Sequence, residues 1–255
     1  MPKSMNKRET GRPFSGSTLK WLAILLMLAD HVGASLLEIF VLNGYGNSPL
    51  AGMIEHMEFW WSIDRILRYI GRSAFPIFCF LLVEGAVHTR DIGKYARRLL
   101  VFALVSELPF DLALRNHFPW WAHQNVFCTL ALGLLAIQIF RKSAGREWRG
   151  VAALGAAAIL AEVCNTDYGA TGVLVITVMY LLRENRIAAL AVSYVLLAVG
   201  GRIELYALPG FLALLLYNGK RGHQPKYFFY WFYPVHLLAL WGLGNFVLPY
   251  VIGKI

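Results

Sequence analysis

Several ionisable side chains lie deep inside long apolar stretches of the chain. Asp30 and His31 stand at the middle of the apolar run 19–42, and His236 lies near the middle of the run 227–250. An ionisable group at the centre of a membrane-spanning helix costs about 2.5–3.5 kcal/mol on insertion scales. Histidine titrates near neutral pH, so either imidazole could take a proton from a hydroxyl or an amine and return it. The alternative is that Asp30 and His31 only join helices by hydrogen bonds.

Arginine is the second unexpected residue type in these apolar stretches. Arg65, Arg68 and Arg72 form one stripe near the start of the run 63–88, and Asp64 is spaced to pair with Arg68. Arg72 lies about 13 Å along this helix, too deep for its side chain to reach water comfortably. It therefore needs a buried carboxylate, for which there are three candidates: Asp30, Glu107 and Asp111.

Further polar residues suggest the shape of a site. His31, Ser35 and Glu38 would share one face of a regular helix. Pro109 predicts a kink that opens a polar pocket beside Glu107 and Asp111. Glu84 and His88 stand four residues apart near a helix end, and we expect either a site or a solvated helix terminus there.

The elements that must position these groups are transmembrane helices. Hydrophobic residues make up 58% of the 255 positions and charged residues 15%, well below the roughly 25% of soluble domains. Nine apolar segments predict an all-α, polytopic membrane bundle of about nine spans, with eight or ten as alternatives. These segments are 19–42, 63–88, 96–114, 124–140, 149–164, 168–182, 187–201, 204–217 and 227–250. Residues 1–18 are expected to form a disordered basic tail, and 19–255 a single domain.

Positive charge predicts the orientation of the bundle. With nine spans and a cytoplasmic N-terminus, eighteen of the 24 Lys and Arg residues fall on the cytoplasmic side. The net charge of +9 is therefore explained by membrane topology, and we expect no nucleic-acid partner. One cytoplasmic cluster, Lys94, Arg97 and Arg98, either anchors a helix end or binds the phosphates of a donor. The three cysteines show no metal-ligand spacing, so we expect neither a metal site nor a disulfide framework.

Several stretches resemble the TraX family, whose founding member acetylates the N-terminus of a conjugative pilin. The matching stretches are 28–33 (LADHVG), 71–78 (GRSAFPIF), 84–85 (EG), 88–89 (HT), Tyr95, 97–99 (RRL), 106–110 (SELPF), 125–127 (NVF) and 232–237 (FYPVHL). The resemblance is strongest over 19–135 and returns near 227–240. It implies acetyl-CoA as the acyl donor and His31 as the general base, but it does not imply pilin as the acceptor.

These observations favour an acyltransferase in the bacterial inner membrane that acts on an envelope acceptor. Asp30 would hold an arginine of a neighbouring helix and so orient a partner, while His31 faces a cavity. Lys94, Arg97 and Arg98 would bind acetyl-CoA. The acceptor side would be shaped by six polar residues, namely Arg68, Arg72, Glu84, Glu107, Asp111 and His236. A proton-coupled transporter would also bury such charges, but they crowd into the first three predicted helices, which favours an enzyme. A structural component of an envelope or pilus assembly machine is the third hypothesis.

Overall fold

The computed structural model describes residues 11–42, 57–223, 225 and 227–252, apart from the side chains of Met57 and Ile252. All regular elements of this part are helices, and its two β-bridges are isolated. Each of the nine apolar segments contains helix, so the predicted all-α fold is confirmed.

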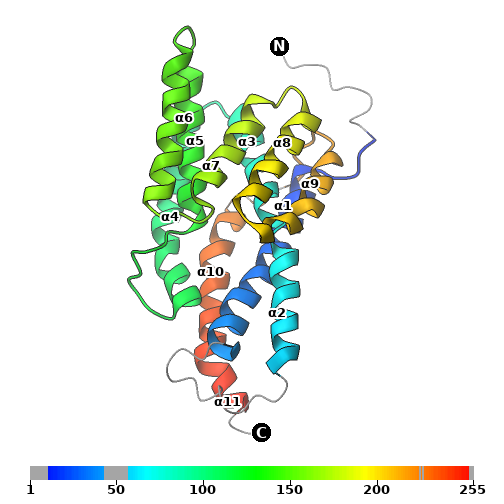
Figure 1. The fold of residues 1–255 in the computed structure, drawn as a ribbon, viewed down its shortest axis with the longest axis vertical. Coiled ribbons are helices and arrows are strands. Elements are labelled where there is room, and N and C mark those ends of the chain that lie inside the picture. Colours follow the sequence, from blue (N-terminus) through cyan, green and yellow to red (C-terminus); the bar gives the residue numbers. More distant parts are fainter. Residues whose placement is uncertain (1–10, 43–56, 224, 226, 253–255) are drawn as a thin grey trace.

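Three long helical stretches run along the longest axis of the molecule (Figure 1). In the first, α1 (Gly16–His31) continues directly into a π-helix, η1 (Val32–Leu42). The second comprises α2 (Met57–Gly71) and α3 (Ala74–His88), and the third α10 (Phe228–Gly242), η3 (Leu243–Val247) and α11 (Leu248–Ile252). By length and composition, the described residues contain three stretches able to cross a membrane: Gly16–Leu42, Glu58–His88 and Phe228–Val251.

The remaining helices pack beside the upper half of these three stretches. They are α4 (Ile92–Arg115), α5 (Val126–Lys142), α6 (Glu147–Val163), α7 (Gly169–Leu181), α8 (Arg186–Gly200), η2 (Arg202–Ala207) and α9 (Leu208–Leu215). Figure 1 shows the α3–α4, α5–α6 and α7–α8 connections at one end of the molecule and α11 at the other. These three connections carry basic residues that predict the cytoplasmic side. The membrane orientation and the number of spans stay predictions.

The α4–α5 and α6–α7 connections and η2 lie near the middle of the long axis (Figure 1). The α2–α3 break lies at the same level, and it interrupts a segment predicted as one helix, 63–88. Pro76 lacks the N–H that would bond to the carbonyl of Arg72, so one helical hydrogen bond is missing at this break. The hydroxyl of Ser73 instead donates to the carbonyl of Tyr206 and accepts from the backbone N–H of Gly210. The broken helix thereby brings α2, α3 and η2 together.

The first helix begins close to its predicted position. Ser15 caps α1 by accepting a hydrogen bond from the backbone N–H of Thr18. The backbone of Phe14 bonds with Leu216 and Asn218, which ties the start of α1 to the end of α9. The predicted disordered tail, 1–18, therefore overlaps α1 at its end, and residues 1–10 lie outside the described part.

Candidate functional site

A cavity of about 220 Å³ lies at the level of the α2–α3 break. It is enclosed by α1, η1, the α2–α3 junction, the end of α4, the α4–α5 and α6–α7 connections and α10. Its polar lining comprises Asp30, His31, Glu38, Arg68, Arg72, Arg115, His123, Asp167 and Tyr168, and much of the rest is aromatic. The long helices and the short ones thus meet around one polar space.

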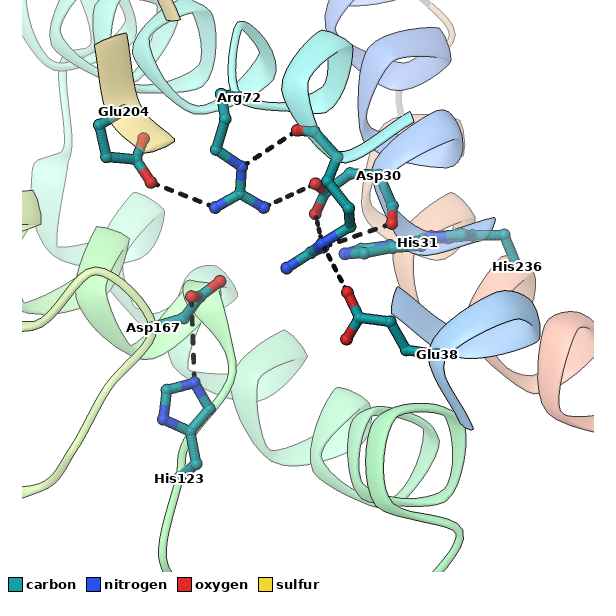
Figure 2. A network of polar contacts seen from close by, with 9 residues as sticks. Asp30, His31, Glu38, Arg72, His123, Asp167, Glu204 and His236 are labelled. Carbon is teal, nitrogen blue, oxygen red and sulfur yellow. Dashed lines mark hydrogen bonds and ion pairs between the residues drawn. The ribbon is translucent and has the colours of Figure 1, made fainter. Parts of the chain in front are cut away.

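One wall of the cavity is a network of ion pairs, which Figure 2 shows and which we call the ion-pair centre. The two carboxylate oxygens of Asp30 bind different arginines: Oδ2 is 2.7 Å from Arg68 and Oδ1 is 2.6 Å from Arg72. Arg68 also pairs with Glu38 at 3.1 Å, and Arg72 with Glu204 at 3.2 Å. Every guanidinium in this centre therefore has two carboxylate partners.

The predicted buried partner of Arg72 is confirmed as Asp30, one of the three candidates. The predicted pair of Asp64 with Arg68 is wrong, because Arg68 turns toward Asp30 and Glu38. Oδ1 of the buried Asp64 has no hydrogen-bond partner in the described residues. The ion pairs between helices are favoured here because Asp30 binds Arg68 and Arg72 at once, whereas Asp64 could pair with Arg68 alone.

The two predicted histidines meet on α1 and α10. Nδ1 of His31 lies 2.6 Å from Nε2 of His236, and the two rings are nearly parallel at 10°. Nδ1 of His236 in turn lies 2.7 Å from the backbone carbonyl of Phe232. Both imidazoles are buried, and the ring of Phe232 stacks on His236 at 4.8 Å. Two residues 205 positions apart thus form one hydrogen-bonded unit.

This unit fixes which nitrogen carries each proton. A carbonyl oxygen can only accept, so Nδ1 of His236 must be the donor to Phe232. In the neutral state Nε2 of His236 then accepts, and Nδ1–H of His31 donates to it. Nε2 of His31 is left with a lone pair on the opposite side of the ring, and His31 lines the cavity. The arrangement presents a proton acceptor to the cavity.

Other predicted site residues do not reach the cavity. Glu107 accepts a hydrogen bond from the side chain of Asn125, and Asp111 accepts one of 2.7 Å from the backbone N–H of Trp120. Both carboxylates therefore hold the α4–α5 connection in place. The prediction of a polar pocket beside Pro109 is wrong. Helix α4 continues to Arg115, and the carboxylates of Glu107 and Asp111 bind the α4–α5 connection. The prediction that Ser35 shares a face with His31 and Glu38 is also wrong, because the side chain of Ser35 does not line the cavity. The π-helical winding after His31 changes the angle between successive residues.

Glu84 lies outside this site as well. Its carboxylate accepts a hydrogen bond of 3.2 Å from the hydroxyl of Tyr217 near the end of α9. Its backbone carbonyl contacts Nδ1 of His88 at 2.8 Å. Neither Glu84 nor His88 lines the cavity, so the structure favours the interpretation of this pair as part of a helix terminus over that of a site.

Lys94, Arg97 and Arg98 form an exposed cluster at the start of α4, which we call the basic rim. Lys94 pairs with Asp91 at 3.4 Å, and Arg98 lies over the ring of Tyr95. The backbone N–H of Lys94 also donates to Asp91, which lowers the pKa of that carboxyl below its ordinary value. Twelve residues of α4 separate Arg98 from Phe110 at the cavity, about 18 Å along the helix axis. The basic rim is therefore remote from His31.

The aromatic run at the start of α10 has two faces. Tyr227, Phe228 and Trp231 are exposed, as an interfacial belt would be. Tyr233 is buried and lines the cavity, where its ring meets that of His31 edge to face. One part of this run is therefore placed as in an interfacial belt, and another part forms a wall of the cavity.

Four cavity or network residues have no counterpart in the sequence-based site: Glu38 as an ion-pair partner, His123, Asp167 and Glu204. Glu204 and Asp167 lie in the region 149–217, which reads as nearly bare of charge. The predicted confinement of the buried charges to the first three helices is therefore wrong, since η2 and the α6–α7 connection also contribute. The sequence signal closest to this site is Pro76, just after the α2–α3 break, which indicates an interruption of the helix there.

Within the described residues, the fold and the site define a helical protein with three stretches long enough to span a membrane and a polar cavity that all three help to line. The model of the TraX protein family matches residues 15–244. The chain belongs to this family, as the resemblance at 28–33 and 232–237 predicts.

A relative supports this assignment. The chain is 30% identical over 254 residues to the probable fimbrial assembly protein FimC, serogroup H1, of Dichelobacter nodosus. The match covers 89% of this chain and 94% of that protein. No solved structure gives a significant match.

Proposed function

We infer that the chain is a multi-pass acyltransferase of the inner membrane, which transfers an acetyl group from acetyl-CoA to an acceptor in the cell envelope. The observation that carries this inference is the hydrogen-bonded unit of Phe232, His236 and His31. It holds Nε2 of His31 as a proton acceptor in a cavity whose lining includes the ion-paired Asp30, Arg68 and Arg72 and several aromatic rings.

The chemistry follows from this placement. An amine or hydroxyl of the acceptor attacks the thioester carbonyl carbon while its proton passes to Nε2 of His31. The C–S bond then breaks, and the leaving thiolate of coenzyme A takes that proton from His31. His236 keeps the ring oriented and stabilises the imidazolium, because its Nε2 accepts from Nδ1–H of His31 in both states. His236 is thus a positioning residue.

The ion-pair centre supports the same chemistry. Asp30 adjoins His31 in the chain and is held from two sides by Arg68 and Arg72, so the end of α1 is fixed where the base must point. Tightly held polar groups do not need to reorganise during a reaction. This arrangement agrees with the prediction that Asp30 holds an arginine of a neighbouring helix while His31 faces a cavity.

The basic rim remains our candidate for the phosphates of coenzyme A. Its position agrees with a donor that arrives from the cytoplasm, because Lys94, Arg97 and Arg98 lie at a predicted cytoplasmic helix end. The long arm of the donor would then extend along α4 toward the cavity, over the roughly 18 Å that separate the two sites.

The test is transfer of radiolabelled acetyl groups from acetyl-CoA to a membrane extract by the purified protein in nanodiscs. We expect the wild type to label an envelope component and His31→Gln to transfer about 10²–10⁴-fold more slowly, since general base catalysis is lost. The matched control is His88→Gln, which removes an imidazole outside the cavity. Equal transfer by His31→Gln and the wild type would remove His31 from the mechanism.

Two other functions remain candidates because a specific observation favours each. The name of the Dichelobacter nodosus relative favours a part in fimbrial assembly, which a structural component could also play. The charges that Glu204 and Asp167 add to the buried region favour proton-coupled transport. A wild-type protein that transfers no acetyl group would favour the first, and one that moves protons across a vesicle membrane without acetyl-CoA would favour the second.

A further inference from the structure

A second histidine and carboxylate face the cavity and have no part in the mechanism described above. His123 lies in the α4–α5 connection and Asp167 in the α6–α7 connection, and both line the cavity. Figure 2 shows them on the side of the ion-pair centre away from His236. Their side chains are about one-third exposed.

The chain builds this pair from two connections that are joined to each other. The backbone N–H of Gln124 donates to the carbonyl of Asn165, and that of Asp167 donates to the carbonyl of Gln124. The hydroxyl of Thr129 donates to the backbone carbonyl of Asp167, which anchors the second connection to α5. The ring of His123 stacks on Phe110 at 5.8 Å. The two side chains are thus positioned by fixed backbone rather than by one another.

The spacing within the pair is too large for a direct hydrogen bond. Nε2 of His123 lies 4.0 Å from Oδ1 of Asp167, whereas an N–H···O bond spans about 2.7–3.2 Å. Backbone bonds hold both residues at this separation, so a third polar group can bond to both at once. Such a group must donate to the carboxylate and bond to the imidazole, as an amine or a hydroxyl does.

We propose that His123 and Asp167 form the acceptor subsite of the transferase, and that they hold the amine or hydroxyl group that receives the acetyl group. This inference rests on the proposed function. The location agrees with it, because the α4–α5 and α6–α7 connections lie at the ends of their helices opposite the predicted cytoplasmic side (Figure 1). Donor and acceptor would then approach His31 from different sides.

The ion-pair centre, which faces this subsite across the cavity, does not favour an anionic acceptor group. Arg68 and Arg72 each already have two carboxylate partners, so binding an anion would require one of these ion pairs to break. Asp167, in contrast, has its carboxylate 4.0 Å from Nε2 of His123, too far for a direct hydrogen bond. This carboxylate therefore favours a group that donates a hydrogen bond.

The test uses hydroxylamine as a small acceptor, because it is neutral at neutral pH and both donates and accepts hydrogen bonds. Formation of acetohydroxamate from acetyl-CoA is measured for the wild type, His123→Gln and Asp167→Asn in nanodiscs. We expect the KM for hydroxylamine to rise about 10- to 100-fold in both variants, because a hydrogen bond to a charged group is lost. The KM for acetyl-CoA should change less than about twofold, and the thermal unfolding temperature in detergent should not fall.

His117→Gln is the matched control, since His117 lies in the same connection but does not line the cavity. Unchanged KM for hydroxylamine in both variants, with an active wild type and an inactive His31→Gln, would overturn the subsite and leave the proposed function standing. Equal changes in both KM values together with a lower unfolding temperature would show a purely structural role and also overturn it. A wild type no faster than buffer would overturn the proposed function itself.

Discussion

The ion-pair centre and the basic rim use the same residue type in opposite ways. In the centre, Arg68 and Arg72 are mostly buried, and each binds two carboxylates across helices. On the basic rim, Arg97 and Arg98 are exposed, and the one ion pair there, Lys94 with Asp91, joins neighbouring turns of one chain segment. A buried arginine is therefore bound to the fold by its partners, whereas an exposed one keeps its charge available for a ligand.

The largest effect that would test this contrast is expected for Arg72→Ala. The change leaves the buried Glu204 without its cation, and Asp30 keeps only Arg68. Removing one partner of a buried ion pair costs about 3–5 kcal/mol of folding free energy, so the yield of folded protein should fall together with activity. Thermal unfolding in detergent measures the loss. An unchanged unfolding temperature would mean that Arg72 is not needed for packing, and the contrast with the basic rim would disappear.

An intermediate effect is expected for Gly71→Ala, which tests the packing of α1 against α2 without removing a charge. A Cβ at residue 71 would lie 2.2 Å from Cβ of Asp30 and 2.8 Å from its Cα, so the helices must separate. Overpacking of this kind costs about 1–3 kcal/mol and would shift Asp30 relative to its arginines. Gly155→Ala is the matched control, because nothing lies within 4 Å of its Cβ position. If both variants unfold at the same temperature, the close approach at Gly71 does not constrain the centre.

The smallest effect on stability is expected for the double change Arg97→Gln and Arg98→Gln. Exposed charges contribute about 0–1 kcal/mol, so the unfolding temperature should stay close to that of the wild type. The KM for acetyl-CoA should nevertheless rise about tenfold if these side chains bind its phosphates, with a smaller effect on the acceptor. A reporter fused to the C-terminus checks that the orientation in the membrane is kept. Unchanged affinity for coenzyme A would leave the basic rim as a positive-inside anchor only.

Much of the fold and part of the site could be predicted from the sequence. The length of the apolar runs predicts helices, and the depth of Arg72 predicts a buried carboxylate partner. Asp30 was among the candidates because both residues lie midway along their apolar runs. His31 and His236 were recognised separately for the same reason, but their mutual hydrogen bond was not predicted. No pattern along the chain relates α1 to α10.

The errors have a common cause. The depth of Glu107 and Asp111 in an apolar run makes them candidates for Arg72, but both carboxylates bind the α4–α5 connection instead. The spacing of Asp64 predicts a pair with Arg68, yet Asp30 and Glu38 reach that guanidinium from another helical stretch. Each polar group bonds to whichever partner the packing brings nearest, and spacing within one helix does not specify that.

By itself the sequence determined that the chain forms apolar helices and that its deep charges must be paired, because hydrocarbon offers no other way to satisfy them. Only the tertiary structure decided the partners. The break after Gly71 and the short helices bring Glu204, His123 and Asp167 to the level of Asp30 and His31, from positions 92 or more residues away. Ion pairs and hydrogen bonds form over a few ångströms, so the identity of a partner depends on how the helices meet.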